Sequence, residues 1–174
     1  KNQQLQKNLE GCYVTVPTPF SDLPGFPINE SALRSYVNFL IDGGLSANSA
    51  VFLAGGAAGD FSTMTLQERI RVAEIVISEV AGRVPVAMGA QSTSTLELVQ
   101  IAQAAQKIGA SYIQVSCPFY FSHTEGDFEE YVRAAAEAAP DVGIIIYNTF
   151  WNSANISFAM VQRLAEIPNV VGLK

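Results

Sequence analysis

The sequence predicts an α/β fold in which parallel strands alternate with helices, and two observations lead to this prediction. Short apolar runs, each bounded by Gly, Pro or Asn, alternate with amphipathic helical patterns. None of these runs alternates polar and apolar residues, so both faces of each strand should be buried, as is typical of a parallel sheet. The six predicted strands are residues 13–16, 50–54, 84–88, 112–116, 143–147 and 170–173.

The intervening helices carry recognisable start and stop signals. The first apolar stripe runs from Leu33 to Ile41 and ends at two glycines, which favour helix termination. The second and third helices open with Ser/Thr-x-x-Glu sequences, residues 65–68 and 94–97, which predict capping boxes. We expect the fourth helix to begin at Asp127 and the fifth near Ser157.

The spacing of the strands favours a barrel over an open, doubly wound sheet. No Gly-x-Gly-x-x-Gly sequence follows the first strand and no P-loop is present. A complete (β/α)8 barrel takes about 250 residues, whereas this chain has 174 and supplies about the first six βα strands. We therefore predict a single TIM-barrel domain over residues 1–174, incomplete at its C-terminal end, and expect the protein to continue past Lys174.

Composition excludes several classes of protein. Ten Lys and Arg residues against sixteen Asp and Glu residues give a net charge of −6, and no basic cluster exists to bind nucleic acid. No apolar run reaches the roughly 18 residues of a membrane span. The N-terminal residues lack the apolar stretch of a signal peptide, so a cytoplasmic protein is expected. His123 is the only histidine, and without a neighbouring carboxylate cluster no metal site is expected.

Candidate site residues follow from the barrel prediction, because barrel active sites lie at the carboxyl ends of the strands. Lys174 ends the sixth strand, where a neutral amine could form a Schiff base or where an ordinary solvated lysine could lie. Tyr147 ends the fifth strand and could transfer protons or cap the barrel core. The turn of residues 55–59 could bind a carboxylate through its N–H groups, or could be a tight connection only.

Together these residues resemble the dihydrodipicolinate synthase / N-acetylneuraminate lyase family of class I, Schiff-base-forming aldolases. The resemblance covers nearly the whole chain as an ordered set of short motifs. The motifs are Gly11 with Thr18-Pro19-Phe20, the turn at residues 55–60 with Leu66 and Glu68-Arg69, Val84-Pro85-Val86 with Gly89, Gly109-Ala110, Pro118-Phe119-Tyr120, Tyr147-Asn148 and Val171-Gly172-Leu173-Lys174.

The resemblance implies roles for these positions. Lys174 would be the Schiff-base lysine and Tyr147 the proton-transfer tyrosine, while Tyr120 matches a tyrosine that, in some members, reaches into the neighbouring subunit's site. The turn at Gly56, Ala57 and Ala58 would bind the carboxylate of a 2-oxo acid, with Thr18 and Asn148 as further substrate-binding candidates. The family is typically a homotetramer and uses no dissociable cofactor.

The departures from the family pattern concern substrate choice. Family members usually carry hydroxyl residues where this chain has Ala57 and Ala58. Dihydrodipicolinate synthases also place an Arg after the tyrosine of strand five, to hold a second carboxylate, but residues 149–155 contain none. Both departures argue against lysine biosynthesis. Phe150 and Trp151 instead offer an apolar wall that suits a bulky aldehyde, unless Trp151 packs at a subunit interface.

Three functions remain open from the sequence. The leading interpretation is a carbon–carbon lyase or aldolase, including the hydratase-aldolase type, that acts on pyruvate or a related 2-oxo acid and an aldehyde. The first alternative is a dehydratase of 2-keto-3-deoxy sugar acids that uses the same lysine iminium, which the turn at residues 54–59 also resembles. The second is a non-catalytic, 2-oxo acid binding or regulatory barrel, which the two alanines leave open.

Overall fold

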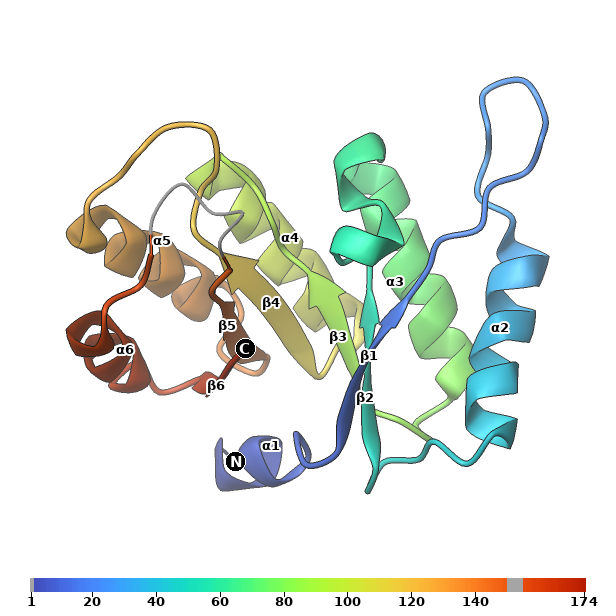
Figure 1. Cartoon of the computed structure of the whole chain (residues 1–174), viewed down its shortest axis with the longest axis horizontal. Coiled ribbons are helices and arrows are strands. Elements are labelled where there is room, and N and C mark those ends of the chain that lie inside the picture. The colour runs from blue at the N-terminus through green and yellow to red at the C-terminus, as the bar shows by residue number, and fades with distance from the viewer. Residues whose placement is uncertain (1, 150–154) are drawn as a thin grey trace.

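The computed structural model describes residues 2–149 and 155–174 of the chain. Its strands form one sheet in which they follow one another in chain order, and every neighbouring pair is parallel. Figure 1 shows the strands side by side, with helices around the outside of the sheet. The strands are β1 (Cys12–Val16), β2 (Ala50–Ala54), β3 (Val86–Gly89), β4 (Tyr112–Ser116), β5 (Gly143–Tyr147) and β6 (Val170–Leu173), and the helices are α1 (Asn2–Lys7), α2 (Glu30–Asp42), α3 (Leu66–Val80), α4 (Thr95–Ile108), α5 (Glu125–Ala138) and α6 (Phe158–Ala165).

The predicted fold class is confirmed, since strict βα alternation around one parallel sheet is the architecture of part of a (β/α)8 barrel. Four strands have the predicted bounds. The third begins two residues later than predicted because Pro85 has no backbone N–H to join the ladder. Its carbonyl still accepts a hydrogen bond from Phe52 N at 3.0 Å, so Pro85 contacts the sheet from one side only.

The helix starts agree with the capping signals, with two differences. Thr65 and Glu68 form the predicted capping box, but at the start of α4 only half of the predicted box forms, because the Glu97 carboxylate accepts from Ser92 instead. The prediction that the fourth helix begins at Asp127 is wrong. Thr124 caps α5, and Asp127 is the third helical residue, whose side chain bonds back to Thr124 N. None of the helices in the described ranges is long and apolar enough to cross a membrane.

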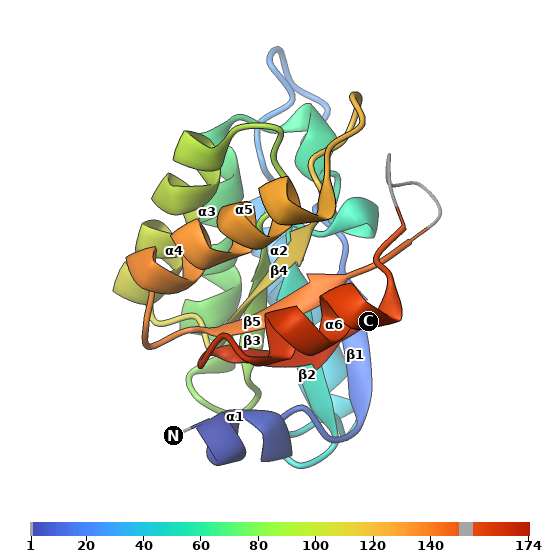
Figure 2. The ribbon, with the colours of Figure 1, turned by 90° about the vertical axis from the view of Figure 1, so that its left-hand side faces the viewer.

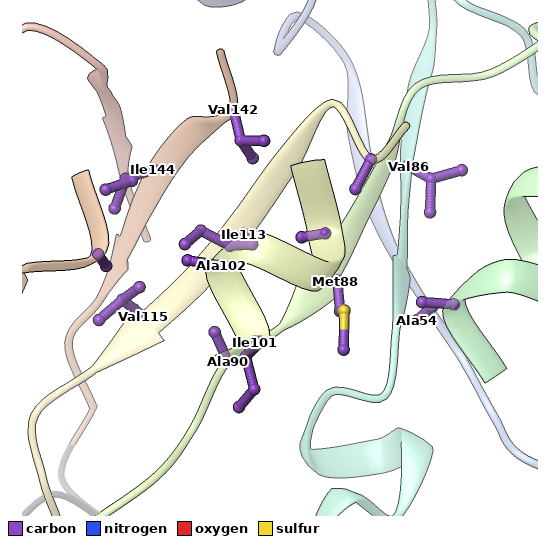
Figure 3. Packing of buried hydrophobic residues seen from close by; sticks show 14 of the residues in the cluster. Ala54, Val86, Met88, Ala90, Ile101, Ala102, Ile113, Val115, Val142 and Ile144 are labelled. Carbon is purple, nitrogen blue, oxygen red and sulfur yellow. The ribbon is translucent and has the colours of Figure 1, made fainter. Parts of the chain in front are cut away.

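The main core lies between the sheet and the helices on its outer face. Figure 2 shows this layer from the side, with α4 and α5 against the strands. In Figure 3, Ile101 and Ala102 of α4 lie against Met88, Ile113 and side chains of the neighbouring strands. Ile101, Ala102, Met88 and Ile113 are at most 1% exposed, so their burial drives the docking of α4 on the sheet.

A second, smaller core lies on the inner face of the sheet. Its buried members come from β2 to β6, and Leu5, Leu9 and Tyr13 pack against them. Helix α1, which was not predicted from the sequence, contributes Leu5 and contacts β6 near the amino ends of the strands (Figure 1). The Tyr112 hydroxyl donates to Leu5 O at 2.7 Å and ties α1 to β4. The buried residues of this inner core are Val51, Leu53, Ala87, Tyr112, Ile145 and Val171.

Candidate active site

A cavity of about 280 Å³ opens at the carboxyl ends of the strands. Parallel strands bring their carboxyl ends to one edge, so segments that are far apart in the sequence meet here. Two of the residues that line the cavity, Ala57 and Tyr147, were predicted site residues. The full lining consists of Ala57, Phe61, Gln91, Ser116, Phe119, Tyr147 and Thr149.

An irregularity in β6 decides which way Lys174 points. Ile144 pairs with Val170 but Ile145 pairs with Gly172, so β6 carries one extra residue at this point. Val171 belongs to the inner core, and strict alternation from it would direct Lys174 outward. The bulge shifts the alternation by one residue, so Leu173 pairs with Ile146, a residue of the main core, and Lys174 faces the inner side.

The Lys174 side chain lies between two tyrosine rings. Its Nζ is 5.0 Å from the ring centroid of Tyr147 and 5.0 Å from that of Tyr13. The backbone aligns the two neighbouring strand ends, because Lys174 N donates to Ile146 O at 2.8 Å and Asn148 N donates to Lys174 O at 2.9 Å. The amine and the Tyr147 side chain therefore lie on the same side of the sheet, which is the arrangement that proton transfer between them requires.

The predicted carboxylate-binding turn follows β2 directly. Ala57–Gly59 form a 3-10 helix whose first hydrogen bond runs from Gly59 N to Gly56 O, at 3.0 Å. The N–H groups of Ala57 and Ala58 come before that bond, so no preceding turn supplies them with a carbonyl. Both alanines are exposed. The turn thus presents two backbone donors at the edge of the cavity, which suits a carboxylate.

Close backbone packing supports this turn from the side of β3. A Cβ atom added to Gly89 would lie 2.0 Å from Gly55 O, so only glycine fits at that position. Arg69, which is 5% exposed, donates from Nη2 to Gly89 O at 3.0 Å and lies over the Phe61 ring at 5.5 Å. Burial lowers the pKa of Arg69, and the charge of Glu97 opposes that shift. Arg69 therefore joins the end of β3 to the segment after the turn.

Two further predicted residues have identified hydrogen bonds within the chain. Thr18 is buried and its hydroxyl donates to Gly59 O at 2.7 Å. The Thr18 hydroxyl proton is therefore engaged in a hydrogen bond with the turn. Asn148 is half-buried and its Oδ1 accepts from Ile156 N at 3.4 Å, which bridges the two ends of the segment after β5. Substrate contact by either residue stays a prediction.

Tyr120 does not join Lys174 and Tyr147 within this chain. Its side chain is 85% exposed, and its ring meets that of Phe121 edge-on at 4.8 Å. Its backbone has a φ of +88°, a left-handed conformation that is unusual for a non-glycine residue. Phe150 and Trp151, the predicted apolar wall, lie outside the described residues.

Several residues that the structure brings to the site were not predicted from the sequence. Gln91 and Ser116 line the cavity at the ends of β3 and β4, and both are at most 4% exposed. Neither amide atom of Gln91 has a hydrogen-bond partner among the described residues. Their position at or just after the ends of predicted strands was a usable signal. Tyr13 offered no such signal, because it begins a predicted strand rather than ending one.

The fold and these side chains define a class of protein: a βα barrel with a lysine and a tyrosine at the carboxyl ends of adjacent strands. Residues 8–174 match the Dihydrodipicolinate synthetase family. The chain therefore belongs to this family, as the sequence motifs predicted.

Known proteins of the family match almost all of this chain. The 4-hydroxy-tetrahydrodipicolinate synthase of Chloroherpeton thalassium is 34% identical over 171 residues, which are 97% of this chain and 54% of that protein. The chloride-inhibited dihydrodipicolinate synthase of Acinetobacter baumannii, solved with pyruvate, superposes with a TM-score of 0.87 at 28% identity, and the match covers 95% of this chain and 55% of that one. YagE, a prophage protein of Escherichia coli K12 also solved with pyruvate, gives 0.86 at 26% identity, with coverage of 94% and 53%. The chain thus spans about half the length of the relatives it matches.

Proposed function

We propose that this protein is a class I aldolase-type lyase in which Lys174 forms a Schiff base with pyruvate or a related 2-oxo acid. The observation that carries the proposal is the position of the Lys174 amine, 5.0 Å from the Tyr147 ring at the carboxyl ends of adjacent strands. Two structural relatives at 28% and 26% identity were solved with pyruvate, which supports the choice of acid.

The chemistry follows from the lysine. The neutral amine attacks the keto carbon, a proton adds to the resulting hydroxyl so that water leaves, and the iminium that forms withdraws electrons from the neighbouring carbon. Loss of a proton from that carbon gives an enamine, which is the nucleophile that attacks an aldehyde. The iminium serves as the electron sink, so the mechanism calls for no dissociable cofactor and no metal. Tyr147 would carry protons to and from the reacting atoms.

The backbone N–H groups at Gly56, Ala57 and Ala58 would hold the acid's carboxylate while the reaction proceeds. With alanine at both positions the turn supplies donors but no hydroxyl, so proton transfer rests more heavily on Tyr147 than in relatives with Thr or Ser. We expect Thr18 and Asn148 to shape this subsite, since each holds a segment beside it.

The relatives and the sequence favour different aldehydes as the second substrate. The names of the curated relatives favour the 4-hydroxy-tetrahydrodipicolinate synthase reaction as a second candidate. The sequence after β5 favours a different partner, because residues 149–155 contain no arginine to pair with a second carboxylate. The described lining of the cavity also contains no charged side chain. We therefore propose a neutral aldehyde, with Phe150 and Trp151 as its apolar contact.

We also propose that the working enzyme is a homotetramer. Tyr120 and Phe121 are 85% and 77% exposed, and aromatic rings that exposed are typical of residues buried by a second copy. In that assembly Tyr120 would complete the site of a neighbouring subunit.

Covalent trapping tests the proposal. The protein is incubated with pyruvate and sodium borohydride, which reduces an imine to a stable amine, and peptide mass spectrometry then locates the adduct. One reduced pyruvate on Lys174 is the expected result. Lys174→Arg should abolish trapping and turnover while leaving the circular dichroism spectrum unchanged, and Lys107→Arg, at the exposed end of α4, serves as the matched control.

The same experiment separates the alternatives. An adduct on another lysine, or none with any 2-oxo acid, overturns the mechanism and favours a binding or regulatory role. If an adduct forms, substrate screening decides the reaction type, because a carbon–carbon lyase releases an aldehyde and a sugar-acid dehydratase releases only water.

A further inference from the structure

Tyr13 approaches Lys174 from the first strand of the sheet. Tyr13 lies on β1 and Lys174 at the end of β6, the first and last strands of the described sheet, yet the Tyr13 ring centroid is 5.0 Å from Lys174 Nζ. Tyr147, from the strand beside Lys174, lies at the same distance. The amine is therefore flanked by two aromatic rings that come from different strands.

Hydrogen bonding does not account for the presence of a tyrosine at position 13. Its hydroxyl is buried and has no hydrogen-bond partner among the residues that the structure describes. Burial also raises the pKa of that hydroxyl, so it stays protonated and neutral. A phenylalanine would fill the same space without the unsatisfied polar atom. What the position does supply is an aromatic ring 5.0 Å from the Lys174 nitrogen.

We infer that Tyr13 is a positioning residue whose ring faces the Lys174 nitrogen and stabilises the positive charge that this nitrogen carries as the iminium of the 2-oxo acid adduct. This inference rests on the proposed function. A cation near an aromatic ring is attracted by the negative charge of the ring face. Tyr13 also packs with Leu5 and Leu9 against the inner core, so its ring is held in place by apolar contacts.

The charge balance of the reaction says which step the ring affects. Imine formation joins the neutral amine to the keto carbon, takes up one proton and releases water, so the nitrogen of the product carries a positive charge that the amine lacked. Proton loss from the adjacent carbon then gives a neutral enamine. The ring therefore stabilises the iminium relative to both the neutral amine and the neutral enamine. Its removal should weaken the covalent capture of the acid more than it slows the later step with the aldehyde.

Variants of Tyr13 test the ring separately from the hydroxyl. The readout is the pyruvate concentration that gives half-maximal borohydride trapping on Lys174, together with KM and kcat for the complete reaction. Tyr13→Leu removes the ring and should raise the half-maximal concentration by roughly 5- to 30-fold, the range of a partly desolvated cation–π contact. Tyr13→Phe keeps the ring and should recover most of that loss.

Tyr112 provides the matched control. It is also an aromatic residue of the inner core, but its hydroxyl donates to Leu5 O, and its ring makes no cation contact with Lys174 within the described part of the chain. Tyr112→Leu should lower the melting temperature without changing the half-maximal pyruvate concentration. If Tyr13→Leu does not fold, Tyr13→Met fills a similar volume without an aromatic ring and takes its place.

The outcomes are distinct. Unchanged trapping in Tyr13→Leu or Tyr13→Met overturns the inference while leaving the proposed function intact. An equal loss in Tyr13→Phe also overturns it, because the hydroxyl would then be the active group. No adduct in the wild-type protein overturns the proposed function, and the role of Tyr13 with it.

Discussion

The Thr18 hydroxyl donates a hydrogen bond to the carbonyl oxygen of Gly59 at 2.7 Å, across 41 positions of the sequence. This bond joins the segment after β1 to the turn after β2, and Thr18 is buried. A Cβ atom on Gly59 would lie 3.0 Å from Val16 O, so the two segments are also in close backbone contact. The bond therefore holds the proposed carboxylate-binding turn at a defined distance from β1.

Thr18→Val should destabilise the protein by about 1–2 kcal/mol, because the buried Gly59 carbonyl would lose its donor while the side-chain volume stays the same. Urea unfolding followed by circular dichroism measures the change. Thr18→Ser keeps the hydroxyl and should recover part of the loss. Thr63→Val is the control, since its hydroxyl bonds to Asp60 O at an exposed site and its replacement should matter little. An equal loss of stability in Thr18→Val and Thr63→Val would show that the buried Thr18 hydrogen bond contributes no more than an exposed one.

Gly89→Ala should prevent folding or destabilise the protein by more than about 2 kcal/mol, since overpacking against rigid backbone cannot relax easily. The added Cβ would lie 2.0 Å from Gly55 O. Gly126→Ala is the comparison, because its Cβ would meet nothing closer than 3.7 Å and the residue lies in the first turn of α5. That change should stabilise by up to about 1 kcal/mol. Thermal melting of both variants measures the contrast, and a well-folded Gly89→Ala protein would contradict the close approach.

Tyr147→Phe should lower kcat by about 10²- to 10⁴-fold, the usual contribution of a proton-transfer group. The ring remains beside Lys174, so borohydride should still trap a pyruvate adduct. Tyr36→Phe, in α2 on the outer side of the sheet, removes a hydroxyl remote from the site and should leave kcat unchanged. If Tyr147→Phe keeps full activity, Tyr147 shapes the cavity without transferring protons.

Trp151→Ala should weaken turnover of aromatic aldehydes more than that of small aliphatic ones, if the residue forms the predicted apolar wall. The measurement is kcat/KM for a matched pair of aldehydes with the same 2-oxo acid. An equal loss for both would mean that Trp151 serves packing instead.

Asn152→Arg adds a positive charge to the same segment, and should improve acceptance of aldehydes that carry a carboxylate.

The sequence determined the strands and most helix starts because the signals are local. A buried parallel strand must be apolar on both faces, and this alone located residues 50–54, 112–116, 143–147 and 170–173. Capping needs a hydroxyl or carboxyl at a set spacing, which identified Thr65 and Ser157. The residue that follows each strand can also be read from the sequence. Because parallel strands end on the same side of a barrel, the pattern alone grouped Lys174, Tyr147 and the glycine turn at one end.

Only the tertiary structure decided how these ends meet. The bulge in β6 arises from its pairing with β5, and it turns Lys174 inward where simple alternation would point it outward. The contact between Tyr13 and Lys174 depends on the curvature of the sheet, which brings its first and last strands close together in space. Helix α1 has six residues, too few to show a reliable helical period of apolar residues. Its position depends on the packing of Leu5 and Leu9 against the inner core. Register, curvature and docking result from contacts between distant segments, so no single stretch of sequence encodes them.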